Sequence, residues 1–178
     1  NDSTPLVSGT AEPNSTVTVY IDSSSVGTTS ADGSGNWNFN VPSALGDGSH
    51  TAKSTATDGS GNTSVDSNTN TFTVDTTGPN TTITSNPTNP TNSTSASFAF
   101  TGSDAGSGVA SFECQLDGGG FSACTSTQSY TGLSDGSHTI DVRAIDTLGN
   151  TDPSPDSYTW TIKTNAPVVT NVTSPTAD

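Results

Sequence analysis

The sequence predicts an all-β fold made of two tandem β-sandwich domains, and three observations support this prediction. The chain is rich in Ser, Thr, Asn and Gly, of which Thr suits the half-exposed face of a strand and Gly and Asn suit turns. Short segments of alternating apolar and polar residues are separated by turn clusters, and no segment has a helical period. The chain also repeats itself, which favours two similar domains over one large domain.

The repeat has a period of 88 residues. At this offset Leu45–Ser64 and Leu133–Asp152 are identical at 11 of 20 positions, and the same register aligns Pro79 with Pro167. Because proline ends a strand and the preceding glycine permits a bend, we place the boundary between the copies just before Pro79. The predicted domains are residues 1–78 and 79–166, followed by residues 167–178 as a linker or the first strand of a next domain.

Each copy is predicted to contain short strands bounded by turn residues. In the first copy they are Leu6–Ala11, Thr16–Ile21, Val26–Thr29, Trp37–Val41, His50–Thr57 and Thr71–Val74. In the second copy they are Thr81–Ser85, Ser95–Thr101, Val109–Leu116, Phe121–Thr125, Gln128–Thr131, His138–Ile145 and Tyr158–Lys163.

The first copy shows no counterpart of the opening strand Thr81–Ser85, which is therefore expected to be missing or supplied from upstream. The C-terminal segment, in contrast, carries three valines without a predicted partner, Val168, Val169 and Val172. An open sheet edge can be completed by a strand from a neighbouring molecule or domain. We therefore predict that the tail acts in strand exchange.

The charge of the chain excludes one class of function. Its net charge is −14, from 3 Lys and Arg against 17 acidic residues, and such a chain repels a phosphate backbone. Most of the acids are Asp, the shorter of the two side chains, which caps turns and supplies loop oxygens to hard cations. We therefore expect no nucleic-acid partner and consider calcium as a cofactor. No apolar run reaches the roughly 20 residues that a membrane span requires.

Two cysteines are present, Cys114 and Cys124, with nine residues between them. In a chain of this composition they predict an exported protein with an internal disulfide. A hairpin centred on Gly118–Gly120 is expected to place Cys124 opposite Cys114. A redox or metal-binding role is disfavoured, because no further cysteine is present and neither histidine is near in sequence.

Characteristic motifs occur in both copies. In the first copy they are Val7–Pro13, Ser15–Asp22, Gly35–Trp37, Asp47–Thr51 and Asp58 with Gly61–Asn62. In the second copy they are Phe112–Cys114, Cys124, Leu133–His138 and Arg143–Asp146 with Gly149–Asn150. Together they closely resemble the bacterial immunoglobulin-like (Ig-like) repeats of large biofilm and surface adhesins and secreted repeat proteins. The resemblance implies Ig-like sandwiches in a rod-like extracellular array, often stiffened by calcium ions between adjacent domains.

In a sandwich of this topology, the loop between the fifth and sixth strands (E and F) lies at the exit end of a domain. The loop after the second strand (B) and the loop between the sixth and seventh strands (F and G) lie at the entry end, so that these loops of the two copies are expected to meet where the domains join. Their oxygen-bearing side chains could supply several of the 6–8 ligands of a calcium ion. The predicted metal ligands are Asp47, Asp75, Asp104, Asp146 and Asn150. The alternative is that these residues serve the turns themselves, since Asp47 precedes glycine, and Asp58 and Asp146 can cap the loops that follow them.

No catalytic residue is predicted. His50 and His138 are equivalent at the 88-residue offset, and a residue repeated in each domain is expected to be structural. No Ser, Cys or carboxylate motif would assemble a nucleophile and base around them. The alternation around four aromatic residues predicts core positions for Trp37, Phe39, Phe72 and Trp160. An exposed aromatic row would instead indicate a sugar-binding platform.

These observations predict a non-enzymatic, extracellular or cell-surface protein. Its expected role is the stalk or spacer of a bacterial surface adhesin, or the shaft of an extracellular filament. The expected partners are neighbouring Ig-like repeats of the same chain or identical subunits. The alternative is an accessory module of a secreted enzyme or adhesin that binds carbohydrate or protein, with host or matrix glycans or proteins as partners; function must be decided from sites rather than fold.

Overall fold

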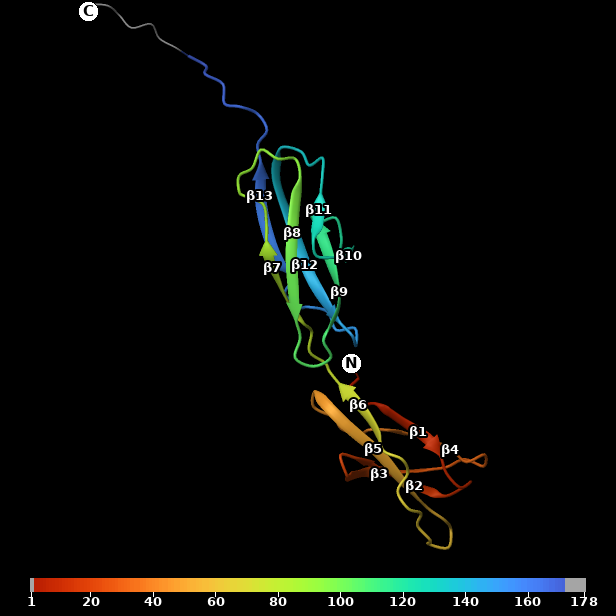
Figure 1. The fold of residues 1–178 in the computed structure, drawn as a ribbon. Helices are drawn as coiled ribbons and strands as arrows, with labels where there is room; N and C mark the ends of the chain where they lie inside the picture. Colours follow the sequence, from red (N-terminus) through yellow and green to blue (C-terminus); the bar gives the residue numbers. More distant parts are fainter. Residues whose placement is uncertain (1, 172–178) are drawn as a thin grey trace, which may run out of the picture. The chain divides into compact units, whose positions relative to one another are not determined.

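The computed structural model describes residues 2–171, which form thirteen β-strands and no helix (Figure 1). Each predicted strand is present, and its ends differ from the prediction by at most two residues. The described residues divide into two compact units. The first comprises residues 2–79 with the loops 104–110 and 145–151, and the second comprises residues 80–103, 111–144 and 152–171. The part of the chain described contains no helix that could cross a membrane.

The first unit contains two antiparallel sheets. One pairs β1 (Leu6–Thr10) with β4 (Asn36–Asn40), and the other has the order β3 (Ser24–Ser30), β2 (Thr16–Ile21), β5 (Gly48–Thr57), β6 (Asn70–Val74). Val17, Val19 and Ile21 alternate along β2 and are buried, because successive strand residues point to opposite faces of a sheet. The core is divided into two small clusters, one around Val17, Val19 and Trp37 and the other around Ile21 and Val41.

The second unit also contains two antiparallel sheets. One has the order β11 (Gln128–Tyr130), β8 (Ala96–Ser103), β7 (Asn80–Ser85), and the other has the order β10 (Ser122–Cys124), β9 (Val109–Leu116), β12 (Gly136–Asp146), β13 (Asp156–Ile162). Their inner faces enclose a single cluster of eight buried residues. Trp160 and Phe98 lie at its centre with ring centroids 5.0 Å apart, and both are fully buried. The prediction of core positions is confirmed for Trp37 and Trp160, whereas Phe39 and Phe72 are partly buried and pack against the clusters of the first unit.

The two units differ at one strand position. In the second unit β7 pairs with β8 from Asn80↔Ser103 to Ser85↔Ala99 (Figure 1). β1, the first strand of the first unit, corresponds to β8, the second strand of the second unit. Among the described residues β1 pairs with β4 alone. That the opening strand of the first copy is missing or supplied from upstream stays a prediction. Val168 and Val169 follow β13 and are exposed, while Val172 lies outside the described residues.

The predicted disulfide between Cys114 and Cys124 is present, with the Cα atoms 5.8 Å apart. The predicted register of its hairpin is wrong. Cys114 faces Ser122, and Cys124 faces Phe112, so the disulfide joins diagonal neighbours. The chain reverses at Asp117–Gly118, where both residues have positive φ and the Gly119 amide donates to the Leu116 carbonyl. This two-residue turn alone would place Cys114 opposite Phe121, so the observed pairing with Ser122 requires one extra residue after the turn, where Gly120 also has positive φ.

Candidate functional site

Three carboxylates converge in the first compact unit, those of Asp75, Asp104 and Asp146. Each carboxylate has one oxygen atom placed so that these three oxygens all lie within 4.8 Å of one another. Asp75 and Asp146 are 1% and 2% exposed, so two of the three are withdrawn from water. Asp75 follows β6 directly, Asp104 follows β8, and Asp146 ends β12.

Backbone amides hold the carboxylates of Asp75 and Asp104. The Ser107 amide donates to both of them, at 2.7 Å to Asp75 and 2.8 Å to Asp104, and Gly108 donates to Asp104 at 2.7 Å. Gly106 packs so closely on Asp75 that a Cβ at this position would lie 2.5 Å from the carboxylate. Glycine is required here for a close approach of backbone to a side chain.

Asp146 is held by the loop that follows it. Its carboxylate accepts from the amides of Leu148 and Asn150 at 2.9 and 2.7 Å and from Asn150 Nδ2 at 2.6 Å. Burial, the largest influence, acts to raise the pKa of Asp146, but the bonds from Asn150 and the other donors outweigh it and leave that pKa lowered. The ionised form of Asp146 is therefore favoured.

Positive side chains do not neutralise this cluster within the described part of the chain. The ion pairs found there join His50 to Asp22, Lys53 to Asp66, His138 to Asp117 and Arg143 to Glu113. Three carboxylates at this spacing repel one another unless a cation or a proton intervenes. Carboxylate oxygens at such distances have the chemistry of a site for a hard divalent cation.

The other two predicted ligands have different surroundings. Asp47 does not join the cluster; its carboxylate accepts from Thr76 and Thr77, both just after β6. The hydroxyls of Thr77 and Thr76 lower the pKa of Asp47. Asn150 does lie at the cluster, but its amide nitrogen donates to the Asp75 carbonyl and to Asp146. Asn150 therefore positions the two aspartates through its donor group.

The alternative turn role also has a structural basis. Asp58, the 88-residue counterpart of Asp146, accepts from the amides of Ser60 and Asn62 and from Asn62 Nδ2. This is the same set of bonds that Asp146 makes. Asp146 therefore caps its loop and also belongs to the acidic cluster, whereas Asp58 only caps its loop.

Both histidines bind an aspartate. His50 Nδ1 lies 2.6 Å from Asp22 and Nε2 lies 2.8 Å from the Gly46 carbonyl, while His138 contacts Asp117 and the Ser134 carbonyl at 2.7 and 2.9 Å. Asp22 and the Gly46 carbonyl raise the pKa of His50, and the Ser134 carbonyl and Asp117 raise that of His138. Because both ring nitrogens face acceptors, each ring satisfies them only when doubly protonated, a form that cannot act as a base.

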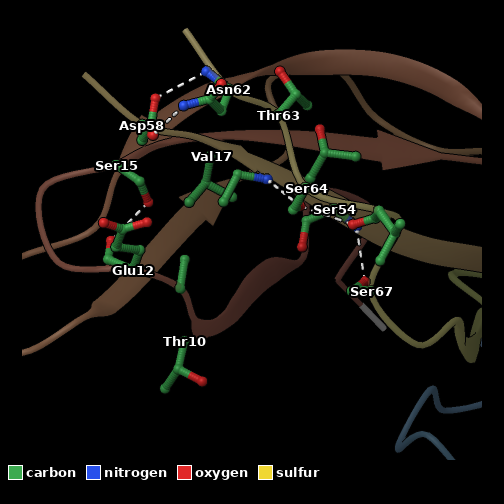
Figure 2. Close-up of a pocket in the computed structure, with 14 residues that line it drawn as sticks. Thr10, Glu12, Ser15, Val17, Ser54, Asp58, Asn62, Thr63, Ser64 and Ser67 are labelled. Carbon is green, nitrogen blue, oxygen red and sulfur yellow. Dashed lines mark hydrogen bonds between the residues drawn. The ribbon is translucent and has the colours of Figure 1, made fainter. Parts of the chain in front are cut away.

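Two neighbouring cavities lie along the open side of the first unit. One, of about 530 Å³, extends along Pro5–Thr10, and the other, of about 470 Å³, extends past Thr10 to the loop after β5. They share the lining residues Thr10, Ser54 and Ser67. Figure 2 shows the second cavity, where Ser54 and Ser67 lie close together and Asp58 binds Asn62.

The comparisons with known proteins agree with this architecture. Residues 1–76 match the family model described as a bacterial Ig-like domain. The structure is similar to that of a 1.5-MDa bacterial ice-binding adhesin, with a TM-score of 0.54 and 20% identity over 90% of this chain and 57% of that chain. It is also similar to fibronectin(III)-like modules of Clostridium thermocellum CbhA, with a TM-score of 0.47 and 17% identity over 90% and 87% of the two chains. The comparison with curated proteins found no match.

The resemblance predicted from the motifs is thus confirmed: residues 1–76 have the sequence of a bacterial Ig-like domain. The chain as a whole has an Ig-like, all-β fold that resembles modules of bacterial adhesins. The chain covers 57% of the adhesin structure, and the likeness establishes the fold.

Sequence reasoning missed the aspartates that bind the histidines. Asp22 and Asp117 lie 28 and 21 residues before their partners, and no local motif connects them. The available signal was the positive-φ turn that each aspartate begins, at φ 48° and 50°, a conformation that Asp tolerates better than most residues. Neither turn could be recognised as a histidine site without the sheet pairing.

Proposed function

We propose that the chain is a non-enzymatic extracellular spacer built from two tandem Ig-like domains, as in the stalk of a bacterial surface adhesin or the shaft of a filament. The observation that carries this proposal is the use of the same polar contacts in both units. Asp58 and Asp146 cap equivalent loops, and His50 and His138 bind equivalent aspartates. Polar groups repeated in this way serve each domain's own stability.

The competing role as a carbohydrate-binding module has less support. Such a module needs aromatic side chains on a surface, and both tryptophans are buried. The large hydrophobic residues exposed in the described part of the chain are aliphatic, namely Leu6, Val65, Leu148, Val168 and Val169. None of these exposed residues offers an aromatic face for sugar stacking.

The second part of the proposal is that Asp75, Asp104 and Asp146 bind one calcium ion. Three observations support it: the spacing of their oxygens, the burial of two carboxylates and the ion pairs made elsewhere by the described Lys53 and Arg143. Calcium would receive oxygen ligands from three separate segments of the chain. Its binding would fix Asp75, which follows β6, to the loops after β8 and β12.

Calcium titration with a matched pair of variants tests this site. Asp146→Asn removes a proposed ligand, whereas Asp58→Asn changes the equivalent loop cap away from the cluster. We expect calcium at about a hundredfold excess over its Kd to stabilise the native chain by about 2.7 kcal/mol, raising its melting temperature by several degrees. Asp146→Asn should abolish this rise and Asp58→Asn should retain it.

Calorimetry would supply the stoichiometry, with one ion per chain expected. If calcium leaves the melting temperature of the native chain unchanged, or if both variants respond equally, the cluster is not a calcium site. The spacer role would then rest on the fold and packing alone, and mechanical unfolding tests it separately.

A further inference from the structure

Ser107 is in backbone contact with the segments that carry the three clustered carboxylates. Its amide donates to Asp75 at 2.7 Å and to Asp104 at 2.8 Å. Its carbonyl accepts from Thr147 Oγ1 at 2.9 Å, and Thr147 directly follows Asp146 in the chain. These bonds fix the backbone of Ser107 beside all three aspartates.

The side chain of Ser107 is not used by these contacts. Its Oγ is buried and has no hydrogen-bond partner among the described residues. A buried hydroxyl without a partner has lost its bonds to water, so that it costs folding free energy, and such groups are uncommon in native proteins. The hydroxyl therefore requires a partner that the described part of the chain does not supply.

The Ser107 hydroxyl lies beside Asp146. Burial acts to raise the pKa of Asp146, whereas Asn150 and then the Ser107 hydroxyl lower it. The hydroxyl is thus near this carboxylate, but its geometry does not complete a hydrogen bond. Both oxygens of Asp146 already accept other bonds, Oδ1 from the amides of Leu148 and Asn150 and Oδ2 from Asn150 Nδ2. The Ser107 oxygen therefore lies at the cluster and is free to bind another species.

The distances within the cluster suit a single ion. Oxygens bound to one calcium ion lie at most about 5 Å apart, which is twice the Ca–O distance of about 2.3–2.6 Å. The three carboxylate oxygens meet this condition, since they lie within 4.8 Å of one another. The amides of Gly106, Ser107 and Gly108 all donate to Oδ2 of Asp104. Among the described residues no donor binds its Oδ1, which leaves that oxygen for an ion.

We propose that Ser107 Oγ is a fourth protein ligand of the calcium ion bound by Asp75, Asp104 and Asp146. This inference rests on the proposed calcium site and adds an uncharged residue to it. Three carboxylates already exceed the charge of Ca²⁺ by one unit. A hydroxyl supplies a further oxygen without adding to their repulsion, whereas a fourth carboxylate would increase it. Second carboxylate oxygens and water complete the about 6–8 ligands of the ion.

The proposal gives Ser107 opposite effects on stability with and without calcium. Without the ion, Ser107→Ala removes a buried hydroxyl that has no partner, so the chain should be as stable as the native chain or more stable. With the ion, the same substitution removes a ligand. A serine that served only the fold would instead destabilise the calcium-free chain when replaced by alanine.

Calorimetric titration of the full chain with calcium tests this role. Ser107→Ala should weaken calcium binding about tenfold and leave the calcium-free melting temperature unchanged or raised. The matched control is Ser60→Ala, because Ser60 is exposed and lies in the loop that Asp58 caps away from the cluster. This control should keep the native affinity within about twofold.

Equal calcium affinities of the native chain and Ser107→Ala would overturn the role of Ser107 and leave the three-aspartate site in place. If the native chain binds no calcium, the proposed site and this inference both fail. The two failures are therefore distinguishable in one titration series.

Cadmium tests whether the side chain at position 107 touches the metal. Thiolates favour soft metal ions, so Ser107→Cys should bind cadmium at least tenfold more tightly than the native chain does and should show thiolate-to-cadmium absorption in the ultraviolet. Ser60→Cys is the control for an added thiol, and mass spectrometry checks that Cys114 and Cys124 remain joined. Cadmium binding by Ser107→Cys that is no tighter than that by Ser60→Cys would contradict direct coordination.

Discussion

The two units correspond to the two copies of the sequence repeat. They differ in the sheet that contains β1 in the first unit and β8 in the second unit. The second unit has β7, a disulfide and one continuous core, whereas the first has a two-stranded sheet and a divided core. In the first unit the loop after β5 supplies some of the hydrogen-bond acceptors that an additional strand would supply. Ser67 Oγ accepts from the Ser54 amide and Ser64 Oγ from the Ala56 amide. Loop hydroxyls therefore satisfy two amides of β5 in the first unit.

The core provides the largest expected difference between the units. Trp160 is fully buried at the centre of a cluster of eight residues, whereas Trp37 is 8% exposed and borders the open cavity. Trp160→Ala should destabilise the second unit by about 3–5 kcal/mol, and Trp37→Ala should cost the first unit less. Chemical denaturation of each variant measures both values. Trp160→Phe is the control, because it keeps most of the volume and removes an indole N–H that has no partner.

If Trp37→Ala costs as much as Trp160→Ala, the first core is as tightly packed as the second. The contrast between the two cores would then be wrong.

The disulfide should have the next largest effect, and it should be confined to the second unit. Replacing Cys114 and Cys124 by serine removes a cross-link of sequence separation 10, worth about 2–3 kcal/mol by the loop-entropy model. Thermal unfolding should show the loss in one transition only. A shift of both transitions would indicate that the units do not unfold independently.

The polar contacts of β7 should contribute less to stability than the disulfide does. Thr81→Val leaves the Ala144 amide without its acceptor and should destabilise the second unit by about 1–3 kcal/mol. Ser64→Ala makes the corresponding change at Ala56 in the first unit, where water can reach the open cavity and replace the hydroxyl. Its cost should be smaller. The reverse order would contradict the view that the first unit is open at this position.

The smallest expected effect is a pH dependence shared by both units. Each histidine has a raised pKa, so its contribution to stability is complete below its ordinary value of 6.5 and is lost as pH rises through the raised value. Asp22 has a lowered pKa because of His50, so its contribution is present above 3.8 and is lost as pH falls through the lowered value. NMR titration should place both histidine pKa values above 6.5.

The variant His50→Gln should remove the alkaline loss of stability from the first unit alone. His138→Gln should do the same for the second. Histidines that titrate at or below 6.5 would refute the role of the two aspartates.

The sequence was sufficient to predict the strands, because the period-2 pattern around residues such as Val17, Val19 and Ile21 is a local signal. The internal repeat also predicts that a counterpart of Thr81–Ser85 is missing from the first copy or supplied from upstream, which stays a prediction. The register at Cys114 was not predictable, because it depends on the positive-φ turn at Asp117–Gly118 and on the extra residue near Gly120. The hydrogen bonds of Asp22 with His50 and of Asp47 with Thr76 were missed because each depends on tertiary contacts between distant segments.

The central claim, that the chain is a spacer of two independently folded domains, is tested most directly by pulling single molecules from the two ends. The account predicts two separate unfolding steps. Reduction of the disulfide should lengthen only one of them, by roughly 30 Å for the ten residue intervals released. A single unfolding step, or two steps whose lengths do not change on reduction, would contradict the claim.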